Sequence, residues 1–454
     1  MKGVEVMFRL RSLPRKSLRT TSVLPALALA FLLASTWLLS ACTALAASEK
    51  GRFAFRYTAS LTDEELAWLQ RFDIVVPGDI LPDDQVQALH AAGSKIFFYS
   101  WATGDYISDP GKLDPGSWEA LIYKKRKSWL LNPDKADEGP DGTWRAYYYD
   151  PYPSDFKRAR VGWLEDTREQ SKYDGVFFDL VGSIYIPEYL REVYQSRHPQ
   201  KPYDQALAEI FSKLRKEGSL VFTNQGYRTP QYYLPVADYD LTESLITSYV
   251  WGEKVRIFVE GEGLVEREET FYEPWVDLRR LVGDIQAQVD RYNPSVRILH
   301  LSYTNPFYQP TGDTVSIEGA FYPVFREEID RAAIFYGYAA GKLWGHDSYS
   351  SGPSLSFTKD EIYFTHLGDP QGNDFEERDR VVIRYYENGV VVLNPSTETQ
   401  TVDLGSPLIP GGVRGFQDLY NGTEVAGLWV TIPSTPSPAS GRVYPSGRVY
   451  LYLR

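Results

Sequence analysis

The sequence contains almost no cysteine, since Cys42 is the only one among 454 residues. A single cysteine excludes an intrachain disulfide, so a packed core must supply the stability of the chain. Histidine is also scarce, and the five histidines are scattered without the spacing of paired metal ligands. A zinc centre is therefore not expected, and no pattern in the sequence predicts another metal or a cofactor.

Basic residues are also fewer than acidic residues. Lys and Arg number 48 against 60 Asp and Glu, which gives a net charge of −12. Residues 1–42 carry six basic side chains and one acidic one, so the rest of the chain has a net charge of −17. A chain this acidic is a poor ligand for nucleic acid or for an anionic membrane surface. It suits a neutral or cationic substrate better than an anionic one.

The first 42 residues have the pattern of an export signal. Basic residues precede an apolar stretch from Val23 to Leu39, which leads into Leu39-Ser40-Ala41-Cys42. This tetrapeptide resembles the lipobox of bacterial lipoproteins, in which the cysteine receives a diacylglyceryl thioether and becomes the mature N-terminus. The resemblance implies a lipid anchor at Cys42 that holds the protein outside the cytoplasm at the bacterial cell membrane. The alternatives, a signal peptide cleaved after Ala46 and an uncleaved anchor helix, also place most of the chain outside the cytoplasm.

Short apolar runs alternate with helical patterns from Phe53 to about Trp344. Strands are predicted at residues 53–57, 73–76, 95–99, 175–179, 220–224, 238–243, 296–302 and 342–345, and a further apolar run lies at 147–150. Helices are predicted between them, among others at 118–131, 155–170, 187–196, 203–217, 275–292 and 322–339. Eight strand–helix units of this kind predict an α/β fold, the (β/α)8 TIM barrel, over residues 50–355. A doubly wound open sheet is the alternative, although no Gly-x-Gly-x-x-Gly follows the first strand.

The pattern changes after about Asp360. Short runs separated by Gly, Pro, Asn and Ser predict strands at 380–386, 389–393, 401–404, 415–418, 427–432 and 447–453. Asn388-Gly389 is typical of a hairpin turn. These features predict a small antiparallel, β-sandwich-like domain over residues 360–454 that follows the barrel without a flexible linker.

Two predicted strands end in a carboxylate. In barrels of this kind the active site lies at the C-terminal ends of the strands. Asp179 ends the run at 174–179, Glu243 ends the run at 239–243, and Asn224 ends the strand between them. Such a pair can cleave a glycosidic bond: one carboxyl protonates the leaving oxygen, and the other attacks the anomeric carbon or activates a water. The alternative is structural, with Asp179 capping a helix and Glu243 forming an ion pair.

The run Asp-Gly-Val-Phe-Phe-Asp at 174–179 resembles the signature G-[FY]-D-G-[VI]-[FL]-[LF]-D of family 114 glycoside hydrolases, which are endo-α-1,4-polygalactosaminidases. Lys95–Asp105 and Trp144–Trp163 are similar to other segments of that family. The resemblance implies a retaining mechanism with Asp179 as nucleophile and Glu243 as acid/base. It also implies an α-linked polysaccharide substrate, with galactosamine-containing polymers as one candidate. The loop Trp101–Asp105 departs from the family pattern, and Ser244–Glu269 has no counterpart in it.

The C-terminal part carries a second resemblance. The runs Gly389–Ser396, Val402–Gly405 and Phe416–Leu419 are similar to the β domain of the hypothetical glycoside hydrolase-like family 15. That resemblance implies a barrel hydrolase with an appended β domain. It agrees with the domain order that the alternation of apolar runs predicts.

Other polar and aromatic residues follow the predicted strands and are candidates to bind sugar hydroxyls or to stack on sugar rings. The candidate substrate-binding residues are Tyr57, Tyr99, Trp101, Asp105, Asp150, Asn224, Tyr227, Tyr303, Trp344 and Asp347. Gln225, Asn305 and His346 also follow predicted strands and are further candidates. The sequence thus predicts an exported glycoside hydrolase whose partners are a polysaccharide and, through Cys42, a membrane. A non-catalytic glycan-binding barrel is the main alternative, followed by a barrel hydrolase of another class and a structural envelope protein.

Overall fold

The computed structural model describes residues 50–454 except 107–112, 114–116, 135–136, 139–144, 305 and 353–357. The predicted export segment with Cys42 lies outside the described residues, and so does Asn305. The described residues belong to one compact unit. In that part of the chain, no helix combines the length and the apolarity that crossing a bilayer requires.

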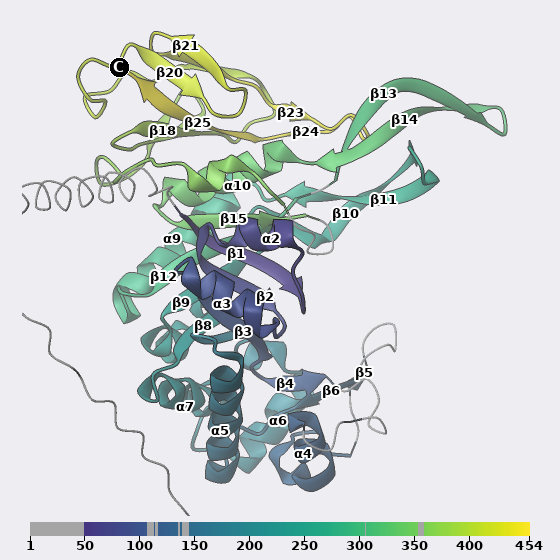
Figure 1. Cartoon of the computed structure of the whole chain (residues 1–454), viewed down its shortest axis with the longest axis vertical. Helices are drawn as coiled ribbons and strands as arrows, with labels where there is room; N and C mark the ends of the chain where they lie inside the picture. Colours follow the sequence, from purple (N-terminus) through teal and green to yellow (C-terminus); the bar gives the residue numbers. More distant parts are fainter. Residues whose placement is uncertain are drawn as a thin grey trace, which may run out of the picture. The chain divides into compact units, whose positions relative to one another are not determined.

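The central sheet of the molecule has eight strands, and its position among the other elements can be followed in Figure 1. Their order in space is their order in the sequence: β1 (Gly51–Thr58), β2 (Phe72–Gly78), β3 (Lys95–Trp101), β7 (Gly175–Asp179), β8 (Leu220–Asn224), β9 (Tyr239–Glu243), β12 (Arg297–Tyr303) and β15 (Asp347–Ser351). Every hydrogen-bonded pair is parallel, and β15 lies beside β1. The fold is therefore the predicted (β/α)8 barrel.

Helices follow the strands and cover the barrel. They are α2 (Asp63–Leu69), α3 (Asp83–Ala91), α4 (Trp118–Lys125), α5 (Ser154–Ser171), α6 (Glu188–Arg197), α7 (Tyr203–Lys216), α8 (Pro230–Tyr233), α9 (Trp275–Tyr292) and α10 (Arg331–Leu343), with 3-10 turns at η1 (Lys127–Trp129), η2 (Ser183–Tyr185), η3 (Gly226–Arg228), η4 (Leu234–Val236) and η6 (Glu361–Phe364). Helix α9 has the predicted bounds because Leu278, Val282, Ile285 and Val289 recur every three or four residues and bury one face.

Aromatic rings fill the interior of the barrel. The ring centroid of Phe222 lies 4.9 Å from that of Phe177, 5.6 Å from that of Phe97 and 6.0 Å from that of Phe53. Most of these pairs meet edge to face, which is the arrangement that ring quadrupoles favour. Part of the aromatic richness of the chain is therefore structural and does not bear on sugar binding.

Two predicted elements differ from the structure. The predicted helix at 322–339 is a strand, β14 (Ala320–Ile329), followed by α10, which starts where the Asp330 side chain accepts from the backbone N–H of Ala333 at 3.1 Å. The predicted strand at 342–345 is the end of α10 and the turn after it, so the eighth barrel strand begins only at Asp347. The apolar run at 147–150 overlaps β6 (Arg145–Tyr148), which pairs antiparallel with β4 (Gly104–Tyr106) and β5 (Asp137–Glu138) outside the barrel.

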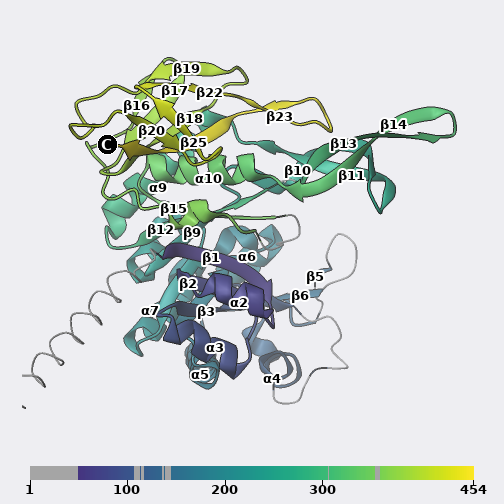
Figure 2. The same ribbon diagram turned by 45° about the horizontal axis from the view of Figure 1, so that its top comes forward.

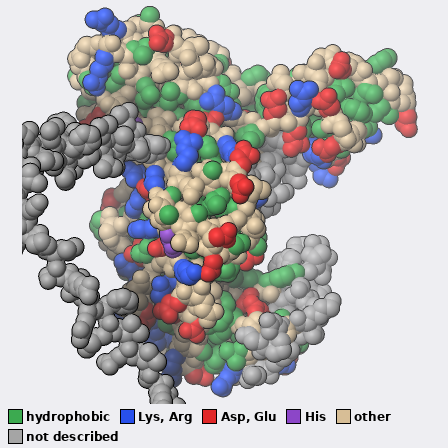
Figure 3. Space-filling model, viewed as in Figure 1, with side chains coloured by type: hydrophobic (Ala, Val, Ile, Leu, Met, Phe, Trp, Pro, Cys, Tyr) green, Lys and Arg blue, Asp and Glu red, His purple; other side chains and the backbone are tan. Residues whose placement is uncertain are grey.

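Two long hairpins pair with each other to form an arm. The strands are β10 (Thr247–Val259), β11 (Gly263–Tyr272), β13 (Pro306–Ile317) and β14, in the spatial order β11-β10-β14-β13. One hairpin follows β9 and the other follows β12, so both leave the barrel at the end where Glu243 lies. The arm projects to one side in two views (Figures 1 and 2), and acidic, basic and apolar side chains are interspersed on it (Figure 3).

The C-terminal residues form the predicted antiparallel sheets. The largest has the order β16 (Glu376–Arg378), β17 (Val381–Tyr385), β18 (Gly389–Asn394), β25 (Ser446–Leu453), β20 (Gly415–Asp418) and β21 (Thr423–Ala426). Two smaller sheets pair β19 (Gln400–Asp403) with β22 (Trp429–Ile432) and β23 (Thr435–Pro436) with β24 (Val443–Tyr444). The division into domains at 355 and 360 stays a prediction.

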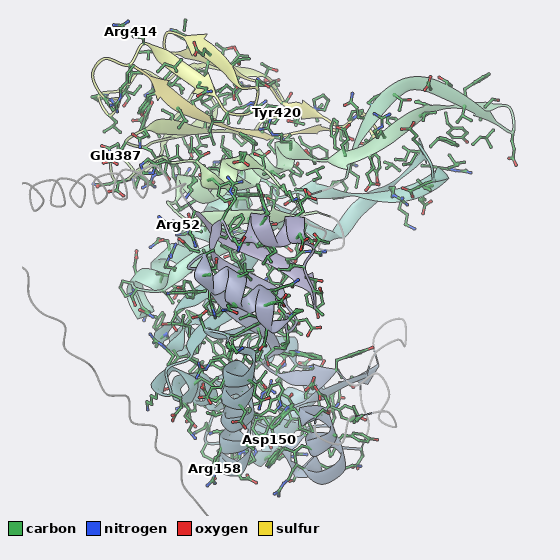
Figure 4. All side chains as sticks on the ribbon, in the orientation of Figure 1. Arg52, Asp150, Arg158, Glu387, Arg414 and Tyr420 are labelled. Atoms are coloured by element: carbon green, nitrogen blue, oxygen red, sulfur yellow. The ribbon has the colours of Figure 1, made fainter. Side chains whose placement is uncertain are left out.

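Helix α10 packs against both β15 of the barrel and β25 of the C-terminal sheet. All of its residues from Ala332 to Gly341, and also Leu343, are buried. A Cβ atom at Gly447 of β25 would lie 2.5 Å from the carbonyl oxygen of Phe335, so only glycine allows this close approach. The Arg331 guanidinium adds hydrogen bonds to the backbone carbonyls of Leu419 and Tyr420, the latter labelled in Figure 4.

Candidate active site

Asp179 and Glu243 lie at the C-terminal ends of β7 and β9, and Asn224 ends β8 between them. The Asn224 Nδ2 donates to Asp179 Oδ1 at 2.8 Å and to Glu243 Oε2 at 2.6 Å. One nitrogen thus holds both carboxylates, and their two oxygens lie no further apart than these two hydrogen bonds together. Among the described residues, neither carboxylate forms an ion pair with Arg or Lys, which sets them apart from structural acids such as Asp150 and Asp238.

Two tyrosines and a backbone amide orient the pair. The Tyr99 hydroxyl donates to Asp179 Oδ2 at 2.6 Å, and the Leu180 N–H donates to Asp179 Oδ1 at 2.7 Å. The Tyr303 hydroxyl donates to Glu243 Oε1 at 2.5 Å. Burial raises the pKa of Glu243; the hydrogen bonds from Tyr303 and Asn224 oppose this rise and the nearby charge of Asp179 adds to it. Glu243 is therefore the member of the pair that is suited to carry a proton.

The residue that follows each of these three strand ends has a left-handed backbone. The φ angles are 51° at Leu180, 59° at Gln225 and 58° at Ser244. Non-glycine residues rarely adopt this conformation, and it costs on the order of 1–3 kcal/mol where the surrounding structure holds it. Only four other non-glycine residues in the described part of the chain share it. Backbone strain of this kind is common at functional sites. Its occurrence after all three strand ends therefore supports a functional site at this end of the barrel.

Asp240 positions the turn after Asn224. Its Oδ1 accepts from Thr223 Oγ1 at 2.6 Å and from the Gly226 N–H at 2.8 Å, while Oδ2 accepts from the Tyr227 N–H at 3.0 Å. Burial raises the pKa of Asp240 to about 7 even though these three donors oppose the rise. Sequence reasoning missed this residue because it lies within a strand, where the strand-end pattern gives no signal.

Gly226→Ala is expected to lower the free energy of unfolding by about 1–3 kcal/mol. A Cβ atom at Gly226 would lie 2.8 Å from Thr223 Oγ1 and 3.0 Å from Asp240 Oδ1, so the turn that follows Asn224 must shift. Chemical denaturation measures the effect. Gly283→Ala in α9 is the control, because no atom lies within 4 Å of its Cβ position; it should gain up to about 1 kcal/mol. Equal behaviour of the two variants would show that the turn tolerates the methyl group.

A cavity of about 600 Å³ adjoins the pair. Tyr99 belongs to both, since it lines the cavity and donates to Asp179. The lining residues are Tyr57, Tyr99, Ser100, Trp101, Asp105, Tyr106, Glu119, Tyr148, Arg160, Trp163, Leu180 and Tyr185. Asp179 and Glu243 are not among them, so the cavity lies beside the pair and does not enclose it.

The structure brings most of the predicted site residues together. Four of them line the cavity: Tyr57, Tyr99, Trp101 and Asp105. Asn224 and Tyr303 bind the carboxylates directly. Tyr227 and Gln225 lie in the turn after β8, where Gln225 accepts from the Tyr185 hydroxyl.

Asp150 and the residues around β15 lie elsewhere. Asp150 is 3% exposed and binds His198 Nε2 at 2.9 Å, beside helix α5 (Figure 4). Trp344 packs on Trp275 and Phe375, with ring centroids 5.5 and 5.3 Å away. Because β15 begins later than predicted, Asp347 stands at the start of the strand and not at its end. There Lys342 and Arg297 pair with it at 2.6 and 3.1 Å, which lowers the pKa of its carboxyl group despite burial.

His346, at the same end of the barrel, binds His300 at 2.9 Å and Gln286 at 2.8 Å. Burial lowers the pKa of His346 to about 4. Both histidines therefore belong to a buried chain of hydrogen bonds away from the carboxylate pair. The predicted position of His346 after the eighth strand is wrong for the same reason as that of Asp347.

The fold and the site together define a parallel barrel with a carboxylate pair at the C-terminal ends of its strands. No family model matches the sequence, and no curated protein matches it. Among solved structures, the glycoside hydrolase domain of PelA from Pseudomonas aeruginosa is 19% identical with a TM-score of 0.43, over 68% of this chain and 97% of that one.

Two further structures illustrate the range of similar folds. Ega3 from Aspergillus fumigatus, solved in complex with galactosamine, is 11% identical with a TM-score of 0.37, over 67% of this chain and 92% of that one. The maltogenic α-amylase AmyB from Thermotoga neapolitana is 11% identical with a TM-score of 0.44, over 90% of this chain and 99% of that one. At these values the similarity concerns the course of the chain and not its activity.

Proposed function

We propose that this protein is a glycoside hydrolase that cleaves an α-linked polysaccharide, with galactosamine-containing polymers as one candidate substrate. The observation that carries the proposal is the Asn224 amide, which holds Asp179 and Glu243 together at the ends of β7 and β9. Ion pairs do not engage these carboxylates in the described part of the chain, so they are available for chemistry.

In this mechanism Asp179 attacks the anomeric carbon and Glu243 protonates the leaving oxygen; Glu243 then takes a proton from the water that releases the sugar. The raised pKa of Glu243 supports its role as the acid. Three donors, the Tyr99 hydroxyl, the Leu180 N–H and the Asn224 amide, orient the nucleophile. Carboxyl groups of retaining enzymes lie roughly 5–5.5 Å apart and those of inverting enzymes roughly 6.5–9.5 Å apart. A pair held by one nitrogen favours the retaining arrangement.

The proposal includes export and a lipid anchor at Cys42, at the bacterial cell membrane. Its support is the lipobox-like tetrapeptide at the end of the apolar stretch. Mass spectrometry of the protein purified from membranes tests it. A diacylglyceryl adduct on an N-terminal Cys42 is expected, and an unmodified N-terminus after Ala46 would replace the anchor with a cleaved signal peptide.

The function is tested by product release from a panel of bacterial and fungal exopolysaccharides that includes partly deacetylated amino-sugar polymers. Release of shorter oligosaccharides by the wild-type protein is expected for at least one polymer, with retention of anomeric configuration by NMR. Binding of a polymer without release would indicate a glycan-binding barrel. Absence of both binding and release across the panel would contradict the proposal.

The pH dependence of kcat/KM should show an alkaline limb set by Glu243. Its carboxyl must be protonated to act as the acid, so activity is lost as the pH rises through its raised pKa. Tyr303→Phe removes a hydrogen bond that lowers this pKa, so the limb should move to higher pH. Initial rates on the substrate found in the panel measure the shift. A limb that stays in place or moves to lower pH would assign it to another group.

A further inference from the structure

The cavity beside the carboxylate pair contains a buried cation, Arg160. Its side chain comes from α5 and is 4% exposed. The Nη2 donates to Ser100 Oγ at 2.7 Å and to the Trp101 carbonyl at 3.1 Å, which ties it to the end of β3. The guanidinium stacks on aromatic rings, with its Cζ 4.8 Å from the centroid of Trp163 and 5.0 Å from that of Trp118. The protein thus fixes a positive charge in the wall of this cavity.

Two residues that line the cavity each carry a donor atom that has no hydrogen-bond partner among the described residues. These atoms are Arg160 Nη1 and Trp101 Nε1, and both are buried. A buried donor without an acceptor destabilises the folded protein. An occupant of the cavity that carries lone pairs would remove this cost. A protonated amine has none, because an ammonium group donates and cannot accept.

Two carboxylates face the same cavity. Asp105 is held in place by Tyr149, whose hydroxyl donates to Oδ2 at 2.9 Å and in turn accepts from Trp118 Nε1 at 2.9 Å. Burial and the charge of Glu119 raise the pKa of Asp105 to about 6, while Arg160 opposes the rise. Glu119, at the start of α4, is the second. An anionic sugar would meet these two negative charges, so a carboxylate or sulfate group is disfavoured.

Unpaired donors and carboxylate acceptors in one cavity with aromatic walls match an uncharged sugar. The hydroxyl or acetamido oxygens of such a sugar can accept hydrogen bonds from Arg160 and Trp101. Its hydroxyl groups can donate hydrogen bonds to Asp105 and Glu119. We propose that this cavity is a sugar subsite beside the cleavage point and that it selects a neutral unit, such as an N-acetylated one, over a cationic or an anionic unit. The assignment of a sugar ligand rests on the proposed function.

The proposal is tested by the binding of three probes that share the same type of sugar ring and differ in charge. The probes are short oligomers of N-acetylgalactosamine, galactosamine and galacturonic acid, titrated calorimetrically into the full protein. The wild-type protein should bind the neutral oligomer most tightly. Arg160→Gln should shift the affinity ratio towards galactosamine by about tenfold, while Arg158→Gln, an exposed position on the same helix, should leave it unchanged. A ratio that Arg160→Gln does not move, or a charged probe that binds best, would overturn the proposal.

Arg160 also packs on aromatic rings, so its replacement could unfold the protein. Asp105→Asn provides a second, nearly isosteric variant. It should weaken binding of the neutral oligomer without the shift towards galactosamine, and thermal unfolding of each variant reports whether it folds. Equal affinity of Asp105→Asn and the wild-type protein for the neutral oligomer would also count against the subsite. If the protein binds the neutral oligomer selectively but cleaves no polymer, the proposed hydrolase activity is contradicted and the subsite is not. If it cleaves a polymer but Arg160→Gln leaves the affinity ratio unchanged, the subsite is contradicted and the hydrolase activity is not.

Discussion

Asp179→Asn is expected to lower kcat by about 10⁴-fold, and Glu243→Gln by about 10²–10⁴-fold, on the natural polymer. Asp179→Asn removes the nucleophile, whereas Glu243→Gln removes the acid. Rates on an activated aryl glycoside distinguish these two effects. A good leaving group departs without protonation, so Glu243→Gln should lose much less glycosylation rate on that substrate, whereas Asp179→Asn should lose as much as before. Pre-steady-state and steady-state rates on both substrates measure this split.

The same two strands supply matched controls. Asp174 precedes β7 and accepts from the Ile96 N–H at 2.8 Å; Asp238 precedes β9 and pairs with Arg215 at 2.8 Å. Both lie at the opposite ends of the strands from Asp179 and Glu243, so Asp174→Asn and Asp238→Asn should change thermal stability more than kcat. A loss of kcat in these controls as large as that in the site variants would show that any carboxylate loss disturbs the barrel, and the assigned roles would fall.

Among substitutions of Asn224, whose side-chain amide binds both carboxylates, Asn224→Asp is expected to lower activity the most. It removes both hydrogen bonds and places a third carboxyl group against Asp179 and Glu243. Like charges at this distance disfavour ionisation, so the folded-state pKa of Glu243 should rise further. Activity should fall by about 10²–10³-fold, as expected when a positioned donor is lost.

The stability of the Asn224→Asp variant should depend on pH with a definite sign. A carboxyl whose pKa is higher in the folded than in the unfolded state stabilises the fold only at low pH, and this stability is lost as the pH rises through the folded-state value. The deficit relative to the wild-type protein should therefore grow from pH 4 to pH 8 in chemical denaturation. Asn394→Asp, at a buried asparagine in β18 that binds backbone carbonyls, is the control for a buried charge away from the pair. A deficit that shrinks with rising pH would contradict the crowding of carboxylates.

The barrel could be predicted from the sequence because apolar runs such as 175–179 are buried on both faces and end in polar residues. Strand-end logic also places Asp179, Asn224 and Glu243 correctly at one end of the barrel. The predicted eighth strand at 342–345 is wrong because α10 is buried on every side, so the residues at its end resemble a buried strand. That shift exchanges the two ends of β15, so Trp344 and Asp347 lie at the opposite end of the strand from the one predicted.

Residues that act from helices or from within strands escaped the same logic. Arg160 reaches the cavity from α5, and Tyr185 reaches it from η2. Asp240 points into the turn after β8 from the middle of β9. Their contacts depend on how distant segments pack, and spacing along the chain does not record that.

Helix α10 has a consequence for the history of the chain. Its small residues on one side let it lie close to the barrel, since a Cβ at Gly341 would lie 3.2 Å from Ser348 Cβ, and β25 covers its other side. A gene that lost the segment after β15 would encode a barrel whose helix α10 exposes an apolar surface. We expect such a protein to aggregate. Because the barrel and the C-terminal sheet each cover one side of α10, we expect the two parts to be inherited together.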